Sequence, residues 1–274
     1  MIHIVCYSGG EASGLVAVEL VRKFGKENVI LLNHDIIARS EHYDIKRFKQ
    51  EVADYLCIPI TYANMKDWET KDQFDVCMDA KAFKVGVHPL CTNRIKTAPF
   101  HKWLEINYPV DKTIGKRDDI ILYYGFEAKE PERIKRRTMI LGKKGYLTDY
   151  PLATWERTIF STTEIGIIPP STYDIWKHAN CTGCLRAGRQ HWYVVYCLRP
   201  EVFEKAKYAE SVIGHSILKG IYLNELEPKF EAMKLLGIKA DEKTQAATFW
   251  SQAKKLLGSQ DQEAGECDMQ LELF

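Results

Sequence analysis

The hydrophobic and polar positions of the first 62 residues follow two alternating periods. Residues 2–7 alternate in polarity and favour β-structure, which predicts a strand. Leu15 and Val18 then recur at helical spacing, and Gly25 ends that helix. The same pattern predicts, in order, a strand at 29–33, a helix at 43–55 and a strand at 58–62. Strands and helices alternating at this spacing predict a Rossmann-like α/β fold, a mostly parallel sheet with helices on both faces.

The second half of the chain has a different pattern of residues, with prolines and helical periodicity in place of alternating strands and helices. Residues 118–125 form the last predicted strand, prolines interrupt the chain after residue 150, and helical periodicity dominates residues 200–257. We therefore predict an α/β domain at 1–148 and a smaller helical, cysteine-containing part at 149–257. The segment 258–274 contains five acids and no Lys or Arg, which predicts a flexible, disordered tail up to its apolar end.

Composition narrows the class of protein. The chain has 274 residues, of which 46% are hydrophobic and 27% charged, so it can bury a core. No apolar stretch is long enough to cross a membrane, and the N-terminus has no secretion leader, so we expect a cytoplasmic protein without membrane contact. Eight cysteines are too few for a disulfide scaffold, which predicts reduced thiols. The oligomeric state stays open.

The net charge of +1 conceals a cancellation between two parts of the chain. Residues 1–257 hold 38 basic and 32 acidic residues, a net charge of +6. A basic body with an acidic tail suits an anionic nucleotide or nucleic-acid substrate better than the overall charge suggests.

The loop after the first strand is a candidate phosphate site. Its residues are Ser8, Gly9, Gly10, Glu11, Ala12 and Ser13. Two glycines allow a close approach of backbone to ligand, and the following helix offers free N–H groups. Asn33, at the end of the second strand, is a further candidate contact. The alternative is a plain tight turn with a capping serine.

Ser-Gly-Gly-x-x-Ser directly after an N-terminal strand resembles the PP-loop of the adenine-nucleotide α-hydrolase-like superfamily. Ala12 stands where the ATP pyrophosphatases usually carry Asp, which favours the phosphoadenosine phosphosulfate (PAPS) reductase branch. Residues 90–99, 150–155, 166–173 and 181–184 resemble further elements of that family, in the family's order. The resemblance covers about residues 3–210. It implies binding of ATP or of a sulfonucleotide (PAPS or adenylyl sulfate, APS), with Mg²⁺ accompanying ATP.

Cys181-x-x-Cys184 is one half of a metal knuckle, because two thiolates at this spacing can face one ion across a turn. Candidates for the other half are Cys77, Cys91, Cys197, His88, His178 and His191. The resemblance selects Cys91. It implies a [4Fe–4S] cluster on Cys91, Cys181 and Cys184, with Cys197 or a His as fourth ligand or with an open iron site. Zinc is the alternative metal, and a redox pair or unligated thiols are the alternatives to any metal.

Basic residues follow the strand at 118–125. Residues 127–145 contain seven basic and three acidic residues. Arginine binds phosphate or sulfate bidentately, so Arg133, Arg136 and Arg137 are candidate contacts for the anionic end of a nucleotide, with Gly125 at the start of the segment. Lys96 is a further anion candidate, and Lys96 and Arg133 are the candidate catalytic groups. The alternative is a solvated helix with Glu–Arg pairs.

Two features of the tail bear on function. Cys267 has acidic neighbours and lacks the Gly and His of the Glu-Cys-Gly-x-His motif of thioredoxin-type sulfonucleotide reductases, so we do not expect it to be a nucleophile. The last five residues resemble the peptide with which bacterial replication and repair proteins dock on the sliding clamp, with Gln270, Leu271, Leu273 and Phe274 as the contacts. The alternative is a tail that folds back onto the core.

These features predict a PAPS reductase-like enzyme. It would bind an adenine nucleotide on residues 8–13 and carry out sulfonucleotide reduction or nucleotidyl or sulfur transfer. One alternative is an ATP-dependent sulfurtransferase acting on DNA or RNA, similar to the phosphorothioation enzymes. The other is a non-catalytic nucleotide-binding protein that docks on a DNA-associated partner such as the sliding clamp.

Overall fold

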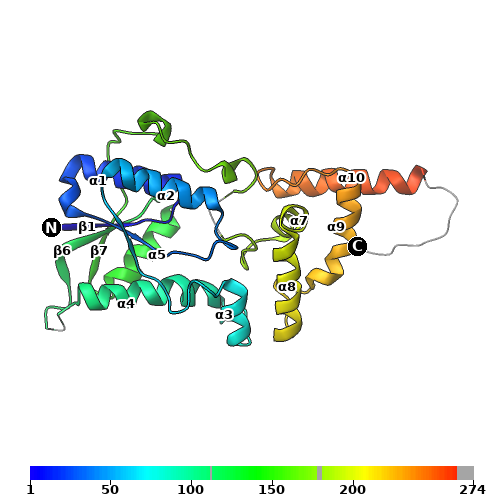
Figure 1. The fold of residues 1–274 in the computed structure, drawn as a ribbon, viewed down its shortest axis with the longest axis horizontal. Coiled ribbons are helices and arrows are strands. Elements are labelled where there is room, and N and C mark those ends of the chain that lie inside the picture. The colour runs from blue at the N-terminus through cyan, green and yellow to red at the C-terminus, as the bar shows by residue number, and fades with distance from the viewer. Residues whose placement is uncertain (112, 178–180, 264–274) are drawn as a thin grey trace. The chain divides into compact units, whose positions relative to one another are not determined.

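A five-stranded parallel sheet forms the centre of the first part of the chain (Figure 1). The computed structural model describes residues 1–111, 113–177 and 181–263. The strand order is β3-β2-β1-β6-β7, with strands β1 (Ile2–Cys6), β2 (Val29–Asn33), β3 (Ile60–Tyr62), β6 (Arg117–Tyr123) and β7 (Tyr146–Asp149). The predicted Rossmann-like α/β fold class is confirmed.

Alternate residues of β1 enter two different cores. Val5 packs with the core of helices α1 (Glu11–Phe24) and α2 (Tyr43–Leu56). Ile4 packs with the core of α4 (Ala98–Asn107) and α5 (Pro131–Gly142). Because successive side chains of a strand point to opposite faces, the two cores lie on the two faces of the sheet. Figure 1 shows α1 and α2 on one side of the strands and α4 on the other.

Short elements complete this first unit. Helix α3 (Gln73–Asp79) precedes a hairpin of β4 (Lys84–Val85) and β5 (His88–Pro89). The π-helical turn η2 (Thr92–Thr97) continues directly into α4. The remaining short pieces are η1 (Lys26–Asn28), α6 (Pro151–Thr154), η3 (Thr162–Ile165) and η4 (Ser171–Asp174).

Residues 149–174 belong to the first compact unit, which comprises residues 1–174 and 181–182 of the described chain. Leu152, Ile159 and Ile167 enter the core under α1. The buried carboxylate of Glu19 on α1 accepts hydrogen bonds from the N–H groups of Thr158 (2.6 Å) and Ile159 (3.0 Å). Because of its prolines, we assigned the segment 149–174 to the second part of the chain. In the structure it packs on the sheet domain.

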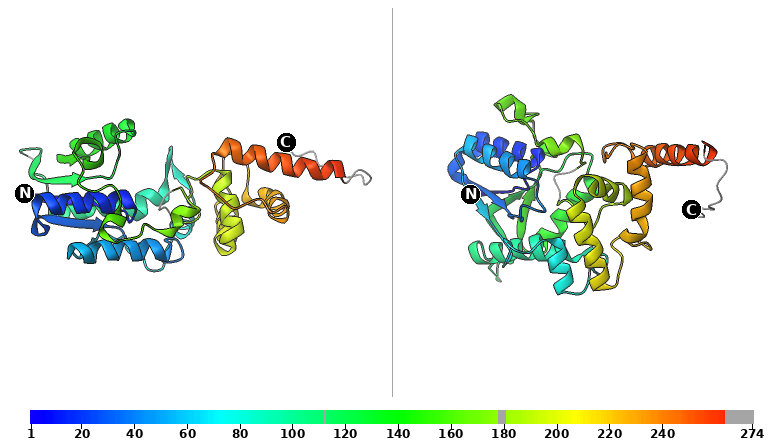
Figure 2. Two further views of the ribbon diagram at one scale, coloured as in Figure 1. Left: turned by 90° about the horizontal axis from the view of Figure 1, so that it is seen from above. Right: turned by 45° about the vertical axis from the view of Figure 1, so that its right-hand side comes forward.

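Four helices make up the second unit, residues 175–177 and 183–263 (Figure 2). They are α7 (Arg189–Leu198), α8 (Pro200–Ile213), α9 (Leu223–Leu235) and α10 (Ala246–Glu263). Trp192, Phe203 and Phe230 are fully buried and form its aromatic core. Cys184 and Cys197 lie in this unit, which confirms the predicted helical, cysteine-containing part.

Helix α10 corrects one prediction about the tail. Residues 258–263 were predicted as the start of a disordered segment, but α10 extends through Glu263. The sequence Ser-Gln-Asp-Gln-Glu contains no proline, so a helix that has already formed can propagate through it. Among the described residues, no helix combines the length and the apolar character that a membrane span requires.

Candidate functional site

The strand order creates a switch point at the carboxyl ends of β1 and β6. From β1 the chain builds outward through β2 and β3, then crosses to the other side of β1 to form β6 and β7. The loops that leave β1 and β6 therefore diverge toward opposite faces. In open α/β sheets, ligands bind in the crevice that this divergence creates.

The loop that leaves β1 contains the predicted phosphate residues. Gly9 has a φ of +82°, and Gly10 is the extended residue that directly precedes α1. The hydroxyl of Ser13 donates to the Gly10 carbonyl (2.8 Å), and the N–H of Ser8 donates to the Ser13 hydroxyl (3.2 Å). The loop is thus closed on itself at the N-terminus of a 14-residue helix. Within the described chain, the N–H groups of Gly9 and Gly10 have no protein acceptor.

Gly125 brings the β6 loop directly against this phosphate loop. A Cβ atom at Gly125 would lie 2.8 Å from the carbonyl carbon of Ala12 and 2.9 Å from its oxygen. Only glycine permits this approach of the two backbones. The structure therefore brings two sequence-predicted groups together at the switch point, residues 8–13 and Gly125.

Glu11 is engaged by the segment after β7. Its carboxylate accepts from the Ser161 hydroxyl (3.0 Å) and the Thr162 N–H (3.2 Å), and its own N–H donates to the Tyr173 hydroxyl (3.1 Å). Glu11 thus fixes the first turn of α1 against residues 161–173. These hydrogen bonds give Glu11 a positioning role. A contact between Glu11 and a nucleotide stays a prediction.

A buried network of Lys49, Glu41 and Asn33, the Lys49 network, holds the start of the phosphate loop. Lys49 on α2 is 1% exposed, and its ammonium donates to Glu41 (2.8 Å) and to the Asn33 side-chain oxygen (3.2 Å). The Asn33 amide in turn donates to the Tyr7 carbonyl. Both polar ends of Asn33 are therefore bonded to protein at the end of β1. We infer that Asn33 positions the loop, and its contact with a nucleotide stays a prediction.

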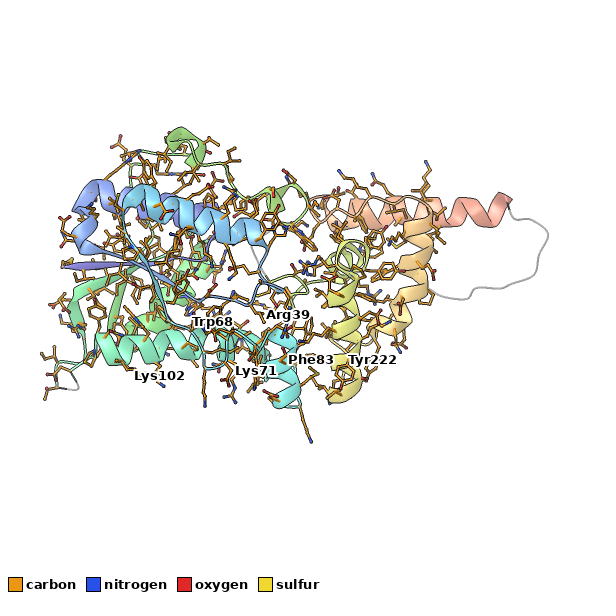
Figure 3. All side chains as sticks on the ribbon, viewed as in Figure 1. Arg39, Trp68, Lys71, Phe83, Lys102 and Tyr222 are labelled. Atoms are coloured by element: carbon orange, nitrogen blue, oxygen red, sulfur yellow. The ribbon has the colours of Figure 1, made fainter. Side chains whose placement is uncertain are left out.

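A second lysine extends the network. Lys46 donates to Asp35 (2.5 Å), lies 3.7 Å from Glu41, and its ammonium is 5.9 Å from the centre of the Trp68 ring, which Figure 3 labels. Our sequence reasoning missed Lys46, Lys49 and their partners. A signal was present, because Lys49 is four residues after Ile45 and three before Val52, within the apolar stripe of α2.

Aromatic rings and arginines line the other side of the switch point. Tyr124 stacks on Phe126 (5.4 Å between ring centres), and Phe126 stacks on Tyr150 (5.9 Å). The Arg133 guanidinium lies 4.3 Å above the Phe126 ring and the Arg137 guanidinium 5.1 Å above the Tyr124 ring. Both contacts are within the range of a cation–π interaction.

The three predicted arginines have different surroundings. Arg133 is paired with Glu130. Arg136 is exposed to solvent. Arg137 lies close enough to Cys6, the last residue of β1, for its charge to favour the thiolate, although burial dominates and raises the pKa of Cys6 to about 12. Arg137 is therefore the arginine best placed for an anion at the switch point.

Lys96 lies near the end of β2. Its charge, together with the larger effect of burial, lowers the pKa of His34 to about 4. The His34 ring nitrogen is hydrogen-bonded to the Ala63 carbonyl (2.5 Å), next to β3. Lys96 is therefore within electrostatic reach of His34, the residue that follows β2, and both its anion contact and a catalytic role of Lys96 or Arg133 stay predictions.

The cysteines of the predicted metal centre occupy different places. The Cys91 thiol is hydrogen-bonded to the thiol of Cys77 on α3. Cys181 lies in the first unit and Cys184 in the second. Cys197 lies on α7, where its thiol bonds to the Tyr193 hydroxyl and burial raises its pKa.

No three His, Cys, Asp or Glu side chains in the described ranges are grouped to hold a metal ion. No step in the proposed chemistry uses a metal centre. The cluster or zinc ion stays a prediction.

His191 has both ring nitrogens engaged within the second unit. The Cys184 N–H donates to its Nε2 (3.2 Å), and its Nδ1 faces Glu242 (3.2 Å). Because Nε2 accepts, Nδ1 is the ring nitrogen left to donate to Glu242. This bonding explains the burial of His191.

The Cys77–Cys91 contact gives a testable pH dependence. The hydrogen bond from Cys77 is the main cause that lowers the pKa of Cys91, and the nearby Lys96 charge acts in the same direction. Cys91 is therefore expected to become a thiolate, and to react with iodoacetamide, at lower pH than an ordinary thiol. Mass spectrometry of labelling rate against pH measures this, with exposed Cys57 as internal reference. Cys77→Ala should move the Cys91 profile to higher pH; an unchanged profile contradicts the contact.

One cavity of the first unit is lined by residues other than those of the phosphate loop. It has a volume of about 900 Å³ and lies between α2 and residues 166–174. Its lining includes four carboxylates, those of Asp44, Glu51, Asp54 and Asp174, and one guanidinium, that of Arg47. This excess of negative charge does not suit an anionic nucleotide.

Comparison of the chain with family models, with curated proteins and with solved structures finds no match. The class that the fold and its switch point define is a Rossmann-like α/β domain followed by a helical unit. The clamp-docking residues Gln270, Leu271, Leu273 and Phe274, and Cys267, lie outside the described residues, so these predictions stay as they were.

Proposed function

We propose that the first unit binds an adenine nucleotide with its phosphates on residues 8–13, as the resemblance to the PAPS reductase-like family implies. The observation that carries the proposal is the contact of this loop with Gly125 at the switch point of the sheet. Two independently predicted segments meet there, and the β1 loop presents N–H groups without protein acceptors.

Each group at the switch point has a role in holding the anion. The N–H groups of Gly9 and Gly10, the Ser8 hydroxyl and the N-terminus of α1 would donate to phosphate oxygens. Arg137 would neutralise the charge that faces β6, and the stacked Tyr124 ring holds its guanidinium in place. The Lys49 network fixes the loop and does not itself face the ligand.

The chemistry that this arrangement favours is nucleotidyl transfer from ATP. An acceptor oxygen would attack the α-phosphorus, the bond to pyrophosphate would break, and pyrophosphate would leave with the electron pair while the acceptor proton passes to solvent. Mg²⁺ would enter with ATP as part of the substrate. Sulfonucleotide reduction at the end of β1 would need a thiolate nucleophile there, and burial of the Cys6 thiol disfavours its thiolate; Cys91, whose pKa is lowered, is the thiol that the reductase alternative would use.

The test is binding and turnover of ATP, PAPS and APS by the full chain with Mg²⁺. We expect ATP to bind and to release pyrophosphate. Ser8→Ala removes an exposed hydroxyl and should weaken nucleotide binding about tenfold, corresponding to one hydrogen bond to a charged group. Ser251→Ala, an exposed serine of α10, is the matched control and should bind as the unmodified chain does.

Absence of binding by all three nucleotides would overturn the proposal. Binding without turnover would select the non-catalytic alternative. Turnover of PAPS or APS without pyrophosphate release from ATP would select the reductase.

A further inference from the structure

Helix α5 has an unbalanced positive charge. At its start, Glu127 pairs with Lys129 (2.6 Å) and Glu130 pairs with Arg133. These pairs neutralise the first part of the basic segment. Within the described chain, no carboxylate is paired with the five later cations, Lys135, Arg136, Arg137, Lys143 and Lys144.

The later cations form two rows along the helix. Arg136 and Lys143 are seven residues apart, as are Arg137 and Lys144, and seven residues are two helical turns, about 10 Å. Lys143 keeps right-handed helical backbone angles at the end of α5, so the first row continues past Gly142, and Lys144 lies in the turn that follows, where its N–H donates to the Leu141 carbonyl (2.9 Å). The charges of Arg137 and Lys144 both lower the pKa of His101 on α4, after the larger effect of burial, which places these two cations on one side of α5.

The helix itself does not require this charge. Cations in the last turn stabilise a helix C-terminus, which accounts for Lys143 and Lys144. Lys135, Arg136 and Arg137 lie too far from that end for this effect. A membrane surface is also a poor match, because Met139 is the large apolar side chain that α5 exposes, at 52%, and one side chain gives no apolar face.

We propose that α5 binds the phosphodiester backbone of a nucleic acid, so that the acceptor in the proposed transfer from ATP is a group within a nucleic-acid strand. Evenly spaced cations in rows match an evenly charged polyanion. The rows begin beside the switch point, because Arg137 stacks on Tyr124 and acts on Cys6 at the end of β1. This inference rests on the proposed function for the chemistry, but the binding of the strand is measured separately.

The experiment is fluorescence anisotropy of labelled DNA and RNA oligonucleotides, single-stranded and duplex, over a range of salt concentrations. The test variant is Lys135→Gln/Lys143→Gln/Lys144→Gln, three exposed side chains outside the nucleotide loop. We expect at least tenfold weaker binding and a log–log salt slope smaller by about 2, at roughly 0.7 per lost contact on a single strand. The preferred oligonucleotide identifies DNA or RNA.

The matched control is Lys239→Gln/Lys243→Gln/Lys255→Gln, which removes the same charge from exposed positions of the second unit. An equal loss in this control would show that net charge alone binds the strand and would overturn the proposal. So would equally strong binding of a polyglutamate peptide, or binding to anionic vesicles without binding to oligonucleotides. Thermal unfolding of both triple variants must match the unmodified chain.

Measuring ATP binding and oligonucleotide binding on the same variants distinguishes a failure of the α5 proposal from a failure of the proposed function. Ser8→Ala should keep oligonucleotide binding and lose ATP affinity, whereas the α5 triple variant should show the reverse. Oligonucleotide binding by a chain that binds no nucleotide would support α5 and overturn the proposed function. ATP turnover without any oligonucleotide binding would overturn the α5 proposal alone.

Discussion

Replacing Glu41 by glutamine is expected to lower the free energy of unfolding of the first unit by about 3–5 kcal/mol. Glu41 is 6% exposed and is the closest carboxylate to the Lys49 ammonium, at 2.8 Å. Without the negative charge of Glu41, the carboxylate that remains near this 1% exposed cation is the more distant Asp35, at 3.8 Å. An uncompensated buried charge is costly because little water can solvate it. Urea unfolding followed by tryptophan fluorescence measures the change.

The control uses the same chemical change at an exposed pair. Lys71, labelled in Figure 3, lies 2.6 Å from Asp79, and the two side chains are 38% and 58% exposed. Asp79→Asn should leave the unfolding midpoint unchanged, since solvent screens an exposed ion pair. The double variant Glu41→Leu/Lys49→Met should recover part of the stability that Glu41→Gln loses, because it removes both charges. Equal effects of Glu41→Gln and Asp79→Asn would contradict the buried network.

The elements nearest the N-terminus were predictable because their patterns are local. The alternation at residues 2–7 gives β1 within one residue, and Gly25 gives the end of α1, whereas α1 begins at Glu11, inside the segment that we predicted as the loop. The fold class follows from the order of such elements. The strand order, and with it the switch point, depends on pairing between β1 and β6, which are more than a hundred residues apart.

The site was predicted in parts and not as a whole. Residues 8–13 and Gly125 were each identified, but their contact required the close approach of two backbones. The Lys49 network joins α2 to Glu41 and Asn33, and no short-range pattern encodes that pairing. The placement of residues 149–174 was missed because three apolar side chains in a proline-rich segment have no periodicity to reveal their burial.

Replacing Gly9 by alanine is expected to destabilise the first unit and to weaken nucleotide binding by at least tenfold. A φ of +82° is unfavourable for a residue with a Cβ, at a cost of about 1–3 kcal/mol. The added Cβ would also lie 2.8 Å from Cγ of Lys49 and 2.9 Å from a methyl group of Ile45. Overpacking of this kind destabilises the folded state by a further ~1–3 kcal/mol. Relief of the contact must move the loop or Lys49, so the loop and its support change together.

Gly142→Ala is the matched control for Gly9→Ala. It lies at the end of α5 with a negative φ, and an added Cβ would meet no atom within 4 Å. Alanine stabilises a helix over glycine by about 0.5–1 kcal/mol, so this variant should be slightly more stable and should bind nucleotide normally. Isothermal titration with ATP and urea unfolding, applied to both variants, give the comparison. If Gly9→Ala kept both its stability and its ATP affinity, the loop could not be a tightly supported phosphate site, because its backbone would tolerate the movement that such a site forbids.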